Sequence, residues 1–258
     1  MQHICTLYTD ARLATIRLPG RDTGGRGTRG KIYSFTGQAR LRLLKKVMQI
    51  ERKYEPIMLT LTYPGEWKQY DYKENLRVFK ERFKRKYPQG SFLWKLEYQK
   101  RGAPHFHLLL FNVNYKSVML WAKKAWYETV KSGDIRHFRA GTRVEIAKNR
   151  SKMISYMCKY VTKVETDKIK ELIDAGIIGE HGLGRFWGKC GDIELILDKG
   201  LTMRLPVGIA YDLKRIFRRM AGTKKQIGSV FLNDPGKLCE LIYLIANNRG
   251  IEYDISYV

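Results

Sequence analysis

Residues 92–113 read FLWKLEYQKRGAPHFHLLLFNV, and this stretch decides the fold. It holds two runs rich in strand-forming residues, 92–98 and 105–113, separated by a short polar segment with Gly102 and Pro104. Two such runs around a glycine-containing turn predict a β-hairpin. The sheet of this protein is therefore expected to be antiparallel at this point.

Alternation along the two strands sorts their side chains between the faces of the sheet. His105 and His107 share one face, while Phe106 and its apolar neighbours point to the other face, into the core. On the preceding strand, Glu97 points to the same side as Lys95. A hairpin that turns near Arg101 brings Glu97 beside the two histidines.

Two imidazoles and a carboxylate on one face predict a metal site. Neutral imidazoles and a carboxylate suit Mn²⁺ or Mg²⁺ when a phosphate supplies further oxygen ligands. We therefore expect His105, His107 and Glu97 to be metal ligands. The alternative is that the two histidines of this strand simply face solvent.

A second stretch, residues 151–163, has the period of a helix with one apolar side. Its opposite side gathers tyrosines and lysines: Lys152, Tyr156, Lys159, Tyr160 and Lys163. A phenol is a poor nucleophile at its ordinary pKa of about 10. Neighbouring ammonium groups and a polarised phosphate would favour the phenolate and make attack on phosphorus possible. The alternative is a surface helix with two ordinary tyrosines.

The remaining pattern predicts an α+β fold, in which helices pack on a central antiparallel sheet and a mainly helical region follows at the C-terminal end. Helices are expected at 34–50, 73–86, 116–130, 206–220 and 235–247, and further strands at 57–63, 142–147 and 193–197. The only candidate boundary predicts a catalytic domain over 1–205, with a basic N-terminal segment, and a helical region over 206–258.

The net charge of +24 on 258 residues, with a pI near 9.9, favours a nucleic-acid partner. The expected helix 73–86 gathers four cations on one face: Lys73, Arg77, Lys80 and Lys84. This face and Lys152 are candidates for DNA contact, although such a face is also common where a helix is only solvated. The four cysteines lack metal-ligand spacing, and no apolar run approaches a membrane span. A reducing cytoplasm and no membrane partner are expected.

These segments together resemble the HUH endonuclease superfamily, in particular rolling-circle replication initiators of plasmids and small single-stranded DNA phages. The strand-and-turn motif is similar to residues 57–64, and the histidine motif to His105-Phe106-His107, with Glu97 in the place of a third ligand. The nucleophile motif is similar to Tyr156-x-x-Lys159-Tyr160-x-x-Lys163. The resemblance covers about residues 55–165.

The resemblance implies the HUH fold and the nicking of single-stranded or locally unpaired origin DNA through a 5′-phosphotyrosine. Tyr160 is the preferred first nucleophile because it follows a lysine, although Tyr156 also heads a Tyr-x-x-Lys pattern. The chain has no phosphate-binding loop of a helicase motor, so a host helicase and polymerase are expected partners. A transposase or relaxase with the same chemistry, or a nucleic-acid-binding module without catalysis, stays open.

Overall fold

The computed structural model describes residues 2–18, 32, 34–146, 166–176, 184–225 and 227–252. These residues fall into two compact units. The first unit comprises Met1–Thr28, Met48–Glu51 and Leu197–Val258, and the second comprises Arg29–Val47 and Arg52–Ile196. The chain therefore passes from one unit to the other more than once.

The second unit is built on a five-stranded sheet with strand order β6-β3-β5-β4-β7. Its strands are β3 (Ile57–Thr62), β4 (Ser91–Tyr98), β5 (Pro104–Phe111), β6 (Thr142–Ile146) and β7 (Trp187–Cys190). Each neighbouring pair is antiparallel. The predicted α+β class and the predicted hairpin are confirmed, and β7 is a strand that the sequence pattern did not reveal.

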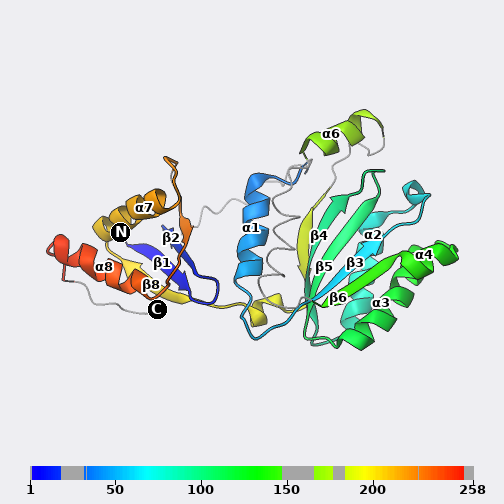
Figure 1. The fold of residues 1–258 in the computed structure, drawn as a ribbon, viewed down its shortest axis with the longest axis horizontal. Coiled ribbons are helices and arrows are strands. Elements are labelled where there is room, and N and C mark those ends of the chain that lie inside the picture. The colour runs from blue at the N-terminus through cyan, green and yellow to red at the C-terminus, as the bar shows by residue number, and fades with distance from the viewer. Residues whose placement is uncertain are drawn as a thin grey trace, which may run out of the picture. The chain divides into compact units, whose positions relative to one another are not determined.

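Helices cover both faces of this sheet (Figure 1). They are α1 (Gly37–Met48), α2 (Tyr72–Lys86), α3 (Tyr115–Val130), α4 (Ile135–Ala140) and α6 (Thr166–Asp174), with a short 3-10 helix η1 (Trp67–Gln69). The side chains of Asp71 and Asn114 accept backbone hydrogen bonds at the starts of α2 and α3. None of the helices in the described part of the chain has the length and apolar character needed to cross a membrane.

The strand expected at residues 193–197 is wrong, because Ile193–Ile196 forms a 3-10 helix, η2. Alternation would bury residues 193, 195 and 197 together. The structure instead buries Ile193 and Ile196 and leaves Leu195 74% exposed. A spacing of three between buried residues is the period of a 3-10 helix, and four residues of apolar sequence do not distinguish the two periods.

The first unit has its own four-stranded sheet, with order β8-β1-β2-β9. Its elements are β1 (His3–Tyr8), β2 (Leu13–Arg17), β8 (Leu201–Leu205), β9 (Ser229–Phe231), α7 (Val207–Met220) and α8 (Lys237–Asn248). One face of the sheet, with Cys5, Leu7 and Met203, forms a core with Leu213 and Phe217 of α7 and with apolar residues of α8.

This grouping differs from the expected division between residues 205 and 206. The N-terminal strand β1 lies between β2 and β8, with Cys5 opposite Met203. Residues 2–17 therefore complete the sheet that α7 and α8 cover, rather than extending the other unit. Pairing between strands almost 200 residues apart leaves no local pattern in the sequence, so the expected boundary followed only the run of helices.

Candidate functional site

The turn between β4 and β5 sets the geometry of the histidine face. Gly102 has a φ of 81°, a conformation that glycine adopts without steric cost. The resulting register places Glu97 directly opposite His105 and Lys95 directly opposite His107. The sequence pattern thus placed the three expected ligands correctly on neighbouring strands.

Glu97 and His107 are joined by a buried polar contact. The Oε2 atom of Glu97 lies 2.9 Å from Nε2 of His107, and the two residues are 8% and 3% exposed. Lys95, on the same face, is fully buried. Buried ionisable groups are costly unless they are paired, so this face carries polar chemistry at the expense of stability.

His105 is held through its Nδ1 atom, which lies 3.2 Å from Oγ1 of Thr62 and 3.3 Å from Nε2 of Gln99. Burial lowers the pKa of His105 to about 4, and the neighbouring His107 lowers it further. The imidazole is therefore neutral near pH 7, which is the form that binds a metal. Within the described ranges, no hydrogen bond reaches its Nε2 atom, which leaves that atom to face a ligand.

Arg101 connects the hairpin turn to the end of β3. Its guanidinium donates hydrogen bonds to the backbone carbonyls of Tyr63, at 2.6 Å, and Pro64, at 2.7 Å. It also donates to Oε1 of Gln99, at 3.1 Å, which orients the amide that meets His105. The two loops beside the histidine face are thus locked together by one side chain.

The end of β3 is also fixed from the helical side. The carbonyl oxygen of Thr62 accepts a hydrogen bond from Nε1 of Trp126 in α3, at 2.9 Å, and lies 2.9 Å from Nε2 of His137 in α4. The backbone N–H of Thr62 donates to the carbonyl of Gly141, at 2.8 Å. Thr62 contacts His105, so α3 and α4 position the histidine face from behind the sheet.

Sequence reasoning did not identify Thr62, Gln99, Arg101 or His137 as part of this site. One signal was present: alternation in IMLTLT places Thr60 and Thr62 on one face of β3. The register then sets Thr60 opposite His107 and Thr62 opposite His105. The contacts of Gln99, Arg101 and His137 depend on turn and loop geometry, for which the sequence carries no comparable pattern.

The donor chemistry of this face fits a divalent cation. Adjacent ligands of an octahedral ion, each about 2.1 Å from it, stand about 3 Å apart. The 2.9 Å between Glu97 Oε2 and His107 Nε2 matches that separation. Among the described residues, however, no group of three or more His, Cys, Asp or Glu side chains is arranged as a metal site. The fit therefore rests on Glu97 and His107, with His105 adjacent: its ring lies 4.6 Å from that of His107.

The expected nucleophile helix lies outside the described residues. This applies to Tyr156, Tyr160 and the lysines around them: Lys152, Lys159 and Lys163. Their roles stay predictions that rest on the sequence motif.

The basic face expected on α2 is less uniform than its sequence indicates. Arg77 forms ion pairs with both Glu74 and Glu81, so its charge is already balanced. Lys73 lies 5.9 Å from the ring centre of Tyr72, Lys80 is half-buried, and Lys84 is exposed. DNA contact by this face stays a prediction, and Lys84 is its most available member.

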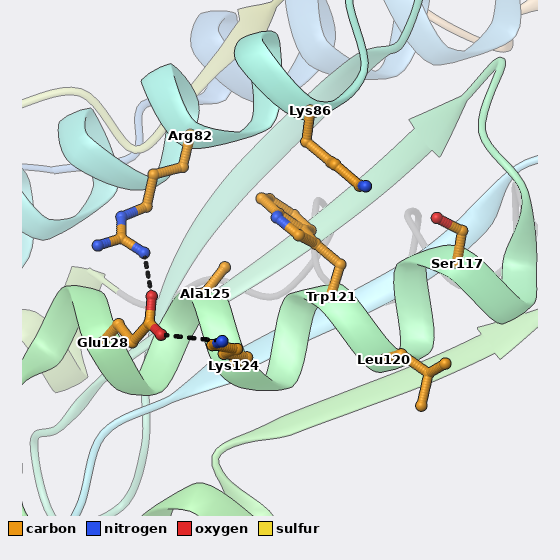
Figure 2. A pocket seen from close by; sticks show the side chains of 8 residues that line it. All are labelled: Arg82, Lys86, Ser117, Leu120, Trp121, Lys124, Ala125 and Glu128. Atoms are coloured by element: carbon orange, nitrogen blue, oxygen red, sulfur yellow. Dashed lines mark hydrogen bonds and ion pairs between the residues drawn. The ribbon is translucent and has the colours of Figure 1, made fainter.

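The opposite face of the sheet carries a hollow of about 510 Å³ between α2 and α3 (Figure 2). Trp121 lies between the two helices, and Arg82 and Lys124 both reach Glu128, at 2.7 Å and 3.8 Å. Two of the cations here are therefore balanced by one carboxylate. Because α2 and α3 pack on Phe92 and Phe106, this hollow is separated from the histidines by the sheet.

Residues 56–165 match the model of a family of replication-associated proteins, the ORF2 family. The resemblance to replication initiators is thereby confirmed over this segment, which contains the histidine face and the tyrosine motif. No curated protein gives a significant match. No solved structure does so either.

Proposed function

We propose that the chain initiates rolling-circle replication by nicking and joining single-stranded origin DNA with a tyrosine nucleophile. The observation that carries the proposal is the buried Glu97–His107 pair beside a neutral His105, within the segment that matches replication-associated proteins. Nicking, the metal and the covalent intermediate are parts of this proposal.

Glu97, His107 and His105 would hold a Mn²⁺ or Mg²⁺ ion. When bound, the ion would polarise the scissile phosphate and offset the negative charge that develops on it. The residues around the site supply orientation: Thr62 and Gln99 hold the His105 ring, and Arg101 holds Gln99. Such support keeps ligands at the separation that the chemistry requires.

The nicking step is a transesterification. The phenol oxygen of Tyr160 forms a bond to phosphorus and gives up its proton, while the bond from phosphorus to the 3′ oxygen breaks and that oxygen takes a proton. The 5′ phosphate stays on the tyrosine, and the 3′ hydroxyl is free to prime synthesis. Tyr156 would perform the later joining step by the same exchange, because residues four apart share one helix face.

The test is formation of a covalent protein–DNA adduct. The purified chain is incubated with Mn²⁺ and single-stranded oligonucleotides that tile the DNA around its own coding sequence, followed by denaturing electrophoresis. An adduct that maps to Tyr160 and disappears with chelator or in His107→Ala supports the proposal. DNA binding without adduct at any metal concentration would instead indicate a binding module without catalysis.

A transposase or relaxase of a mobile element would give the same adduct. The product distinguishes them: an initiator rejoins the displaced strand to itself and releases a circle, whereas a transposase joins it to a second DNA. Circular single-stranded product from a substrate with two nick sites therefore supports initiation.

A further inference from the structure

A second hollow, of about 520 Å³, lies along the free edge of the five-stranded sheet, where β7 has a neighbour on one side only. α1 contributes to its wall, and Figure 1 shows α1 and β7 beside β4. The volume is in the range of sites for small organic ligands. None of the residues discussed above as metal ligands or nucleophiles lines it.

Aromatic rings form much of this wall: Phe35, Trp94, Phe186 and Trp187. Phe35 and Phe186 stack on each other with centroids 5.9 Å apart and are nearly buried. Trp94 lies against the backbone of β7, because a Cβ atom on Gly188 would come within 2.9 Å of the indole. Trp187 is only half-buried, so it is the ring with surface to offer a ligand.

The polar part of the wall is cationic. The single carboxylate, Glu194, is already paired with Lys46, at 3.2 Å, and Lys189, at 2.7 Å. Arg42, Lys80 and Arg185 form no ion pair with any residue that the structure describes. A wall with three unbalanced cations beside aromatic rings is complementary to a ligand with both negative charge and flat apolar faces.

We infer that this edge hollow binds single-stranded DNA, with one unpaired base against Trp187 and flanking phosphates on Arg42, Lys80 and Arg185. Stacked aromatic rings with basic side chains around them are how proteins hold single strands without reading their sequence. Duplex DNA fits the hollow poorly, because its bases are stacked on one another and cannot enter. The inference rests on the proposed function in that its ligand is the strand to be nicked.

The experiment measures binding of a short labelled single strand by fluorescence anisotropy, in chelator so that no nicking occurs. Trp187→Leu and the double variant Arg42→Gln/Arg185→Gln are each expected to bind about tenfold more weakly. The controls are Trp121→Leu, a half-buried tryptophan of the α2–α3 hollow, and Lys116→Gln/Arg139→Gln, which removes the same charge from α3 and α4. Thermal unfolding of each variant confirms that it is folded.

An abasic strand of the same length separates stacking from charge. The loss caused by Trp187→Leu should vanish on this strand, whereas the loss caused by the double arginine variant should remain. Equal affinities of the edge variants and their controls overturn the inference. So does an acidic peptide of matched charge that competes as well as the single strand, because the hollow then selects only for negative charge.

The nicking assay is run in parallel on the wild-type chain. Base-dependent binding at this edge without any nicking leaves the inference standing and removes the proposed function. Nicking with unchanged binding by the edge variants does the reverse.

Discussion

At the scale of single residues, Glu97 decides whether the histidine face holds a cation or only a hydrogen bond. Glu97→Gln keeps the shape of the side chain and can still contact His107, but it removes the negative charge. We expect the metal concentration for half-maximal nicking to rise about 10- to 100-fold. Glu145→Gln removes a carboxylate of β6 that pairs with Arg143 on the surface, and it should leave the metal requirement unchanged. Equal metal curves for both variants would remove Glu97 from the ligand set.

His137 is the residue whose protonation should matter for stability. Burial lowers its pKa, and in the folded chain its Nε2 lies 2.9 Å from the Thr62 carbonyl while its Nδ1 lies 2.8 Å from Oγ of Ser132. The unfolded chain, with a pKa near 6.5, takes up this proton at a higher pH than the folded chain does. The stability contributed by neutral His137 is therefore complete above about pH 6.5 and is lost as the pH falls below that value.

Urea unfolding at pH 7 and pH 5 checks this prediction. The free energy of unfolding of the wild-type chain should fall more between these two values than that of His137→Gln. The amide of glutamine can still donate to the Thr62 carbonyl and does not titrate, and His105 contributes equally to both proteins. An identical fall in the two proteins would contradict the prediction.

The residues that the sequence predicted at this site are those fixed by strand alternation. His105, His107 and Glu97 needed only two neighbouring strands and a turn at Gly102 to come together. Arg101 and His137 act through backbone carbonyls of loops and strand ends, and such contacts depend on where the chain turns in three dimensions. Thr62 lies between these cases, because alternation placed its side chain but not its carbonyl.

At the scale of elements, α2 tests whether a basic helix face in sequence is a basic surface in space. Lys84 and Arg77 lie on the same face, yet Arg77 is held between Glu74 and Glu81. A cation already neutralised by carboxylates releases no counterion when DNA binds. We therefore expect Lys84→Gln to reduce the salt slope of DNA binding by about one, and Arg77→Gln to change it less.

Anisotropy titrations over a series of salt concentrations give both slopes, and the two variants differ from the wild type by the same charge. Equal slopes in Lys84→Gln and the wild type would return this face of α2 to ordinary solvent exposure. A larger change in Arg77→Gln than in Lys84→Gln would mean that the ion pairs open when DNA binds.

The helices α1, α2, α3, α7 and α8 follow the sequence because each has a long apolar stripe. Short elements are different: β7 contains only WGKC, and η2 contains only four residues. β7 pairs with β4 because the ring of Trp94 covers Gly188, a contact that no pattern within WGKC announces. The edge hollow was missed for the same reason, since its wall depends on β7.

At the scale of the whole molecule, the order of segments along the chain differs from their grouping in space. β1 is an inner strand of the first unit, although its residues come first in the chain and its partner β8 begins at Leu201. α7 and α8 bury one face of this sheet through a common core. The first unit is therefore complete only when both terminal regions of the chain are present.

A chain that ends at residue 205 tests this arrangement. It keeps β1, β2 and β8 but loses α7 and α8, so that Cys5, Leu7 and Met203 lose their apolar cover. Exposed apolar sheet surface binds hydrophobic dyes and promotes association. We expect this shortened chain to bind such a dye strongly and to self-associate, as measured by fluorescence and light scattering. A chain that ends at residue 252 is the control, because it retains each described helix and strand. If the chain ending at 205 stays monomeric and binds no more dye than the control, residues 1–205 fold as one independent domain, and the boundary expected from the sequence is the correct one.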